Sequence, residues 1–84
     1  MKVVKASTPV GKLKAVRKGT KIANGLEALL GGVTAEALLE VGIGDDVVDF
    51  CNRRVTKRGY GIALLEGGVI KLVLPEGSTA ILFS

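Results

Sequence analysis

Clustered basic side chains are the strongest chemical signal in this sequence. Nine of its twelve lysines and arginines fall into two groups, one between residues 12 and 21 and one between residues 53 and 58. The two groups comprise Lys12, Lys14, Arg17, Lys18, Lys21, Arg53, Arg54, Lys57 and Arg58. If both groups lie on one face, they form a surface that contacts phosphates of a nucleic-acid backbone. The alternative is two solvated helix faces, the second of which complements the negative end of its helix.

Catalytic and metal-binding side chains are scarce by comparison. The sequence contains no histidine and a single cysteine, Cys51, so the commonest general base is absent and a zinc site lacks its ligands. The acidic cluster of Asp45, Asp46 and Asp49 is interpreted as the capped first turn of a helix, in which Asp49 can also pair with Arg53 four residues on. Neither a dinucleotide fingerprint nor a phosphate-binding loop is present. We therefore predict that the protein is not an enzyme and that it uses no metal and no cofactor.

Composition narrows the class of protein. Eighty-four residues suffice for one small domain, and the net charge of +4 favours anionic partners. The chain is 48% hydrophobic but only 4% aromatic, which indicates either a dense aliphatic core or a surface buried against another subunit.

Cys51 has no cysteine to pair with and is expected to be buried and inert. With no apolar run of membrane-spanning length and no signal peptide, we expect a cytoplasmic protein, or one assembled in a host cytoplasm if it is viral.

The basic N-terminal strand or arm, residues 1–22, has the least regular pattern. Residues 2–6 are typical of a short strand, which ends before Pro9. Residues 11–22 fit a helix that carries a basic stripe, or alternatively a strand or extended segment bracketed by Gly11 and Gly19. The sequence leaves both alternatives open.

Residues 24–58 form the predicted helical part. Asn24 and Glu27 have the spacing of a capping box, so a short helix is expected to begin there. Thr34 is a suitable N-cap for a second helix. The residues that follow it, Ala-Glu-Ala-Leu-Leu-Glu, are strong helix formers and favour this helix. Residues 36–41 also fit a buried strand.

A third helix is predicted over residues 45–58. Val47, Cys51 and Val55 recur at four-residue spacing and give the helix one apolar side. Acidic residues lie in its first turn and basic residues in its last, as the helix dipole favours, and Gly59 is expected to end it.

Residues 61–84 are predicted to form a β-meander. Its three strands are expected at residues 62–65, 69–74 and 79–83. Gly67-Gly68 fits a two-residue hairpin turn between the first two strands. In the middle strand Ile70, Leu72 and Leu74 are expected to face the core.

Three family resemblances bear on nucleic-acid binding. Gly42-Ile43-Gly44 resembles the glycine hairpin of helix-hairpin-helix proteins, whose backbone amides can hold a DNA phosphate, but Asp45 and Asp46 stand where a neutral or basic residue would favour that contact. Two helices followed by a hairpin resemble a winged helix-turn-helix, whose second helix reads the major groove with its N-terminal residues. Here the acidic cluster occupies those positions and would repel phosphates. Residues 2–9 and 40–60 are similar to the Alba and SpoVS group of small nucleic-acid-binding dimers. That similarity requires residues 36–41 to be a strand.

We therefore expect a single α+β domain over residues 1–84, with short helices packed on a small antiparallel sheet. The sheet is the C-terminal three-stranded meander, which an N-terminal strand can join. The expected function is binding of nucleic-acid backbone through the nine clustered basic residues, with weak sequence preference. The alternative is a structural or assembly subunit, such as a phage or virion component. In either case we expect a homo-oligomer that does not bind membranes.

Overall fold

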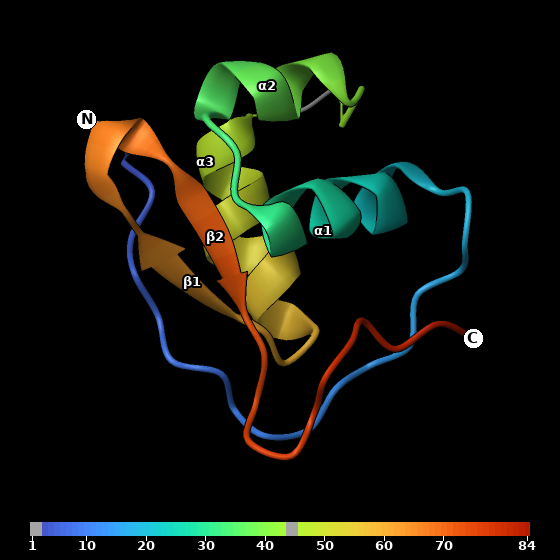
Figure 1. Ribbon diagram of the computed structural model, residues 1–84. Helices are drawn as coiled ribbons and strands as arrows, with labels where there is room; N and C mark the ends of the chain where they lie inside the picture. The colour runs from blue at the N-terminus through green and yellow to red at the C-terminus, as the bar shows by residue number, and fades with distance from the viewer. Residues whose placement is uncertain (1–2, 44–45) are drawn as a thin grey trace.

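The computed structural model describes residues 3–43 and 46–84 and has an α+β fold. Helices pack around a two-stranded antiparallel hairpin (Figure 1). In chain order the elements are α1 (Lys21–Gly31), α2 (Ala35–Glu40), α3 (Val47–Asp49), the π-helix η1 (Phe50–Val55), β1 (Gly61–Leu64), the 3-10 turn η2 (Glu66–Gly68) and β2 (Ile70–Val73). The predicted α+β class is confirmed. Within the described residues, no helix has both the length and the apolarity to cross a membrane.

Helix α1 begins earlier than the sequence predicted. Its N-cap is Thr20, whose Oγ1 accepts a hydrogen bond from the backbone N–H of Ala23 at 3.3 Å. Asn24 and Gly25 lie inside the helix, so the predicted capping box at Asn24 is wrong. Glycine normally weakens a helix interior. Here a Cβ on Gly25 would lie 2.6 Å from Cζ of Phe50, so the glycine is required for α1 to pack against η1.

Helix α2 resolves an alternative that the sequence left open. Thr34 caps it, because its Oγ1 accepts a hydrogen bond from the N–H of Ala37 at 3.3 Å. Residues 36–40 are therefore helical and not a buried strand. The strand that the similarity to the Alba and SpoVS group requires is absent from this stretch.

The third helix consists of two continuous segments, α3 and η1. Asp46 caps it, with Oδ1 accepting a hydrogen bond from the N–H of Val48 at 2.9 Å. Gly59, with a φ of 95°, follows the last helical turn as predicted. Its predicted apolar side is confirmed, because Val47, Cys51 and Val55 are all buried. Residues 44–45, at the predicted start of this helix, lie outside the described residues.

The hairpin of β1 and β2 carries the predicted core face. Ile70 and Leu72 are buried, whereas Lys71 between them is exposed. Gly67 and Gly68 adopt φ values of 77° and 75°, a region that favours glycine. They belong to the three-residue turn η2, which is one residue longer than the turn we predicted.

The third strand of the predicted meander is not confirmed. Described residues 79–83 do not form a strand beside β2, and Phe83 makes one parallel bridge with Val16 instead. The N–H of Val16 donates to the carbonyl of Leu82 at 3.0 Å, and the N–H of Ser84 donates to the carbonyl of Val16 at 2.8 Å. The C-terminal segment therefore pairs with the N-terminal arm, because the arm supplies the backbone groups that it needs.

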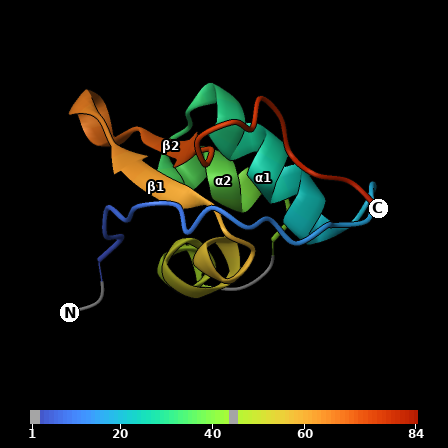
Figure 2. The same ribbon diagram turned by 90° about the horizontal axis from the view of Figure 1, so that it is seen from below.

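The N-terminal arm is extended and crosses the molecule between the hairpin and the third helix (Figure 2). Residues 11–20 form neither a helix nor a continuous strand. Ser7 exchanges two backbone hydrogen bonds with Ile62, at 2.9 and 3.0 Å, and the N–H of Val10 donates to the carbonyl of Gly59 at 3.2 Å. The arm is thus tied to the molecule by isolated backbone contacts.

The predicted strand at residues 2–6 is not confirmed among the described residues 3–6. Their backbone forms hydrogen bonds with the side chain of Asn52 instead of with a neighbouring strand. The N–H of Lys5 donates to Oδ1 of Asn52 at 2.9 Å. In return Nδ2 of Asn52 donates to the carbonyl of Val3 at 2.9 Å. The amide of Asn52 therefore replaces a neighbouring strand, and it holds the start of the arm against η1.

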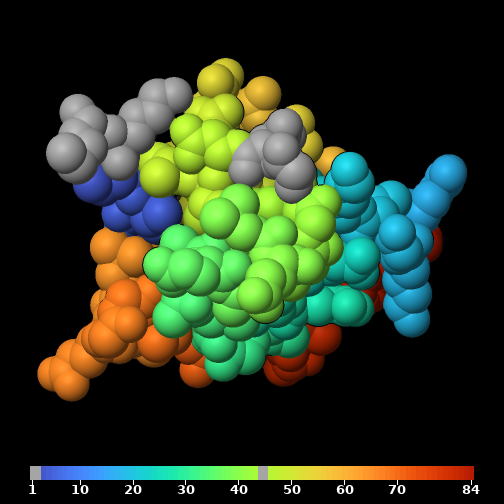
Figure 3. Space-filling model, turned by 90° about the horizontal axis from the view of Figure 1, so that it is seen from above, coloured from blue at the N-terminus to red at the C-terminus, as the bar shows by residue number. Residues whose placement is uncertain are grey.

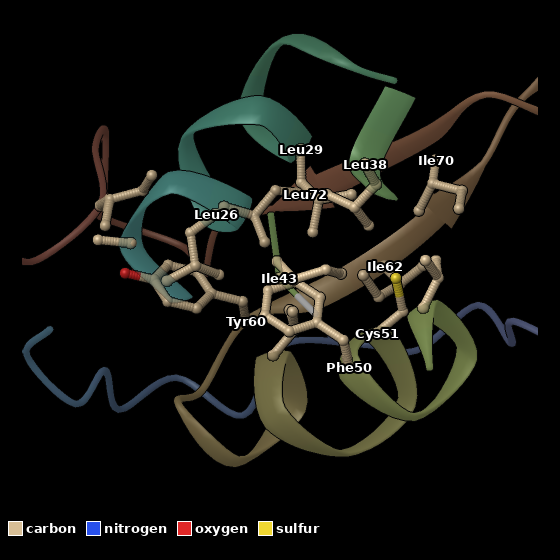
Figure 4. Close-up of a cluster of buried hydrophobic side chains, with 14 of the residues drawn as sticks. Leu26, Leu29, Leu38, Ile43, Phe50, Cys51, Tyr60, Ile62, Ile70 and Leu72 are labelled. Atoms are coloured by element: carbon tan, nitrogen blue, oxygen red, sulfur yellow. The ribbon is translucent and has the colours of Figure 1, made fainter. Parts of the chain in front are cut away.

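The hydrophobic core is one cluster between α1, α2, the hairpin and the third helix (Figure 4). Its fully buried side chains are Leu26, Leu29, Leu38, Cys51, Val55, Tyr60 and Ile62. The ring of Tyr60 packs in this cluster, and its hydroxyl accepts a hydrogen bond from the N–H of Leu82 at 3.0 Å. Tyr60 therefore anchors the C-terminal segment to the core.

We expect Gly25→Ala to lower the free energy of unfolding by about 1–3 kcal/mol, because the added methyl group overpacks the contact with Phe50. Helix propensity alone predicts the opposite, a gain of about 0.5–1 kcal/mol. The matched control is Gly31→Ala, at a position of α1 where a Cβ meets nothing within 4 Å. Urea denaturation of both variants measures the difference, and a Gly25→Ala variant as stable as Gly31→Ala would contradict the packing argument.

Candidate anion-binding site

One basic pocket lies where the N-terminal arm meets the end of the third helix and the start of α1. Its volume is about 320 Å³, and it is lined by Lys14, Ile22, Arg54, Lys57 and Arg58. Every charged side chain among these residues is cationic. The fold therefore brings Lys14 of the first basic group together with three members of the second group.

The third helix presents three of its four basic residues to the pocket. Arg54, Lys57 and Arg58 stand at positions i, i+3 and i+4, which share a helix face. The side chain of Thr56 does not line the pocket, and its hydroxyl donates to the carbonyls of Asn52 and Arg53 in the preceding turn. Local helical spacing thus explains this half of the pocket.

Backbone hydrogen bonds bring Lys14 to the same place. The N–H of Lys14 donates to the carbonyl of Arg58 at 3.0 Å. Nη1 of Arg58 donates in turn to the carbonyl of Ala15 at 2.9 Å. This reciprocal pair fixes the arm against the helix end and orients the Arg58 guanidinium at the rim of the pocket.

Close backbone approach at two glycines makes this path of the arm possible. A Cβ on Gly59 would collide with the carbonyl of Lys12. A Cβ on Gly61 would lie 2.5 Å from the carbonyl oxygen of Ser7. A larger residue at either position would push the arm away, and Lys14 with it.

The other five predicted residues do not line the pocket. Lys12, Arg17 and Lys21 are exposed. Nζ of Lys18 lies 5.2 Å from the centroid of the Phe83 ring, a cation–π distance. Arg53 forms an ion pair with Asp49, with 3.7 Å between Nη1 and Oδ1. The nine residues therefore divide into a pocket of four and a more dispersed set of five.

Sequence reasoning missed one feature of this site. Ile22, an apolar lining residue, gave no signal. The ion pair between Asp49 and Arg53, four residues apart, was predicted and is confirmed, and it separates Arg53 from the other members of its group.

Comparisons with known proteins supply no further guide. No protein-family description, curated protein or solved structure matches this chain. The functional argument therefore depends on the geometry of the site alone.

The acidic residues of the third helix and the thiol of Cys51 have roles in the fold rather than in a reactive site. Asp46 caps α3 and Asp49 pairs with Arg53, as interpreted from the sequence, while Asp45 lies outside the described residues. Within residues 3–43 and 46–84, no group of three or more His, Cys, Asp or Glu side chains is placed to hold a metal ion. Burial raises the pKa of the Cys51 thiol from 9.0 to about 11, because the thiolate would lose its hydration.

The raised pKa of Cys51 predicts a pH-dependent contribution to stability. The folded-state pKa exceeds the unfolded one, so this contribution is fully present below about pH 9 and is lost as the pH rises through about 11. We expect the wild type to lose more stability than Cys51→Ala over this range, as measured by chemical denaturation at each pH. The two proteins differ only at residue 51, so a constant difference in stability between them would show that the thiol does not titrate in this way.

Proposed function

We propose that this protein is a small non-enzymatic protein that binds the nucleic-acid backbone through phosphate contacts. The observation that carries the proposal is the convergence of Lys14 with Arg54, Lys57 and Arg58 around one pocket. The helix dipole accounts for cations at the end of the third helix. It does not account for Lys14, which comes from an arm about 40 residues away in the sequence. A phosphate ligand accounts for all four.

The remaining basic residues extend the same surface property. Lys12, Arg17, Lys18, Lys21 and Arg53 add positive charge outside the pocket. Contacts of this kind position a backbone without reading bases, so binding is expected to show weak sequence preference. The cytoplasm, or a host cytoplasm for a viral protein, remains the compartment in which we expect this binding.

Salt dependence provides the first test. A fluorescent random-sequence oligonucleotide is titrated with protein between 50 and 200 mM salt, and anisotropy reports binding. If the four pocket cations contact phosphates, the affinity should fall by about a hundredfold over this range. The double variant Lys14→Ala/Lys57→Ala should bind more weakly and lose about two units of the log–log salt slope.

Lys71→Ala is the matched control, because Lys71 is exposed on β2 and outside the pocket. A control that weakens binding as much as a pocket substitution would indicate general charge attraction rather than this site. Absence of binding even at 50 mM salt would overturn the proposal.

A second candidate, a subunit of a homo-oligomeric assembly, is favoured by exposed aliphatic side chains. Leu64 and Leu65, at the end of β1 and the start of the turn, each expose 49% of their surface. The hairpin turn projects beyond the rest of the surface (Figure 3). An exposed apolar projection of this kind is typical of an interaction site.

Light scattering coupled to size exclusion tests this second candidate. The assembly hypothesis predicts a defined oligomer for the wild type and a monomer for Leu64→Glu/Leu65→Glu, because charges at an apolar interface oppose association. Val10→Glu is the control, since Val10 is 74% exposed and lies on the arm. A wild-type monomer at every concentration, or equal disruption by the control, would reject an interface at the hairpin turn.

A further inference from the structure

The basic pocket gathers four positively charged side chains around one small volume. Four cationic residues border about 320 Å³, which is near the lower limit for a small-molecule site. We propose that this pocket is a site for a phosphomonoester, the doubly charged phosphate found at the end of a nucleic-acid strand and on free nucleotides. The inference deepens the proposed function, since it assigns a ligand group to the same four cations.

Charge is the first argument for a monoester. A phosphodiester in the backbone carries one negative charge, and each strand of a duplex carries one such charge per about 3.4 Å of helix axis. A phosphomonoester carries about 1.5 to 2 negative charges near pH 7 on three accepting oxygens. Cations gathered around one pocket therefore match a monoester better than an internal phosphate.

Rigidity is the second argument. Arg58 is held by its bond to the carbonyl of Ala15, and Lys14 is held through its own N–H. The guanidinium of Arg58 and the backbone of Lys14 therefore stay beside the same pocket, where the like charges of the two side chains repel each other. A compact anion relieves that repulsion, and an oriented guanidinium can donate two hydrogen bonds to it.

The walls of the pocket are the third argument. They come from three separate elements: the arm, α1 and the end of the third helix. A strand end needs to enter such a hollow from one side only, whereas a continuous backbone must enter and leave. Ile22 supplies an apolar surface, which suits the carbon atoms of a sugar attached to the phosphate.

Paired oligonucleotides test the inference. Two single strands of one sequence, labelled at the 3′ end, differ only in a 5′-phosphate or a 5′-hydroxyl. We expect the phosphorylated strand to bind about tenfold more tightly, as one additional charge-assisted contact provides. The preference should fall in Lys14→Ala and in Lys57→Ala. It should persist in Lys12→Ala, which removes the same charge from the same arm outside the pocket.

Competition by inorganic phosphate and by a nucleoside monophosphate distinguishes strand ends from free nucleotides. Equal affinity for the two oligonucleotides would overturn the inference while leaving backbone binding intact. Binding of the monophosphate without binding of either oligonucleotide would support the phosphate site and overturn the proposed function. Binding of none of these probes would overturn both.

Discussion

The close approach of the N-terminal arm to Gly59 and Gly61 is the constraint on which the rest of the structure depends. The carbonyls of Lys12 and Ser7 occupy space that a Cβ at those glycines would need. Between the glycines, Tyr60 fills the core and accepts the N–H of Leu82. A single tripeptide thus joins the arm, the core and the C-terminal segment. These contacts tie the arm and the C-terminal segment to the core without adding strands to the hairpin.

The predictable part of the fold is the part governed by local interactions. Thr34 and Asp46 cap their helices with hydrogen bonds to residues two or three positions ahead, so their roles could be derived from the sequence. The alternation of Ile70, Lys71 and Leu72 likewise defined the buried face of β2. Each of these signals lies within a few residues of the structure that it specifies.

The errors arose where distant partners override local preference. Asn24 has the spacing of a capping residue, yet Thr20 caps α1 four residues earlier, and Gly25 packs against the distant Phe50 from inside the helix. Residues 79–83 have strand-forming side chains, but Leu82 and Ser84 form backbone hydrogen bonds with Val16 of the arm instead of with β2. The same applies to the site: the basic groups were visible in the sequence, whereas the meeting of Lys14 with Arg58 depends on how the arm crosses the molecule.

The pocket couples charge to the attachment of the arm. Lys14 approaches Arg58 through backbone bonds, although their like charges repel each other. An anion between them replaces that repulsion with attraction, so it should bind more tightly when the arm is docked than when it is displaced. Linkage makes the effect reciprocal: the docked arm strengthens anion binding, and a bound anion strengthens docking by the same factor. Because the arm also contacts Gly59 and Gly61, an anion bound in this pocket would stabilise the connection on which the fold depends.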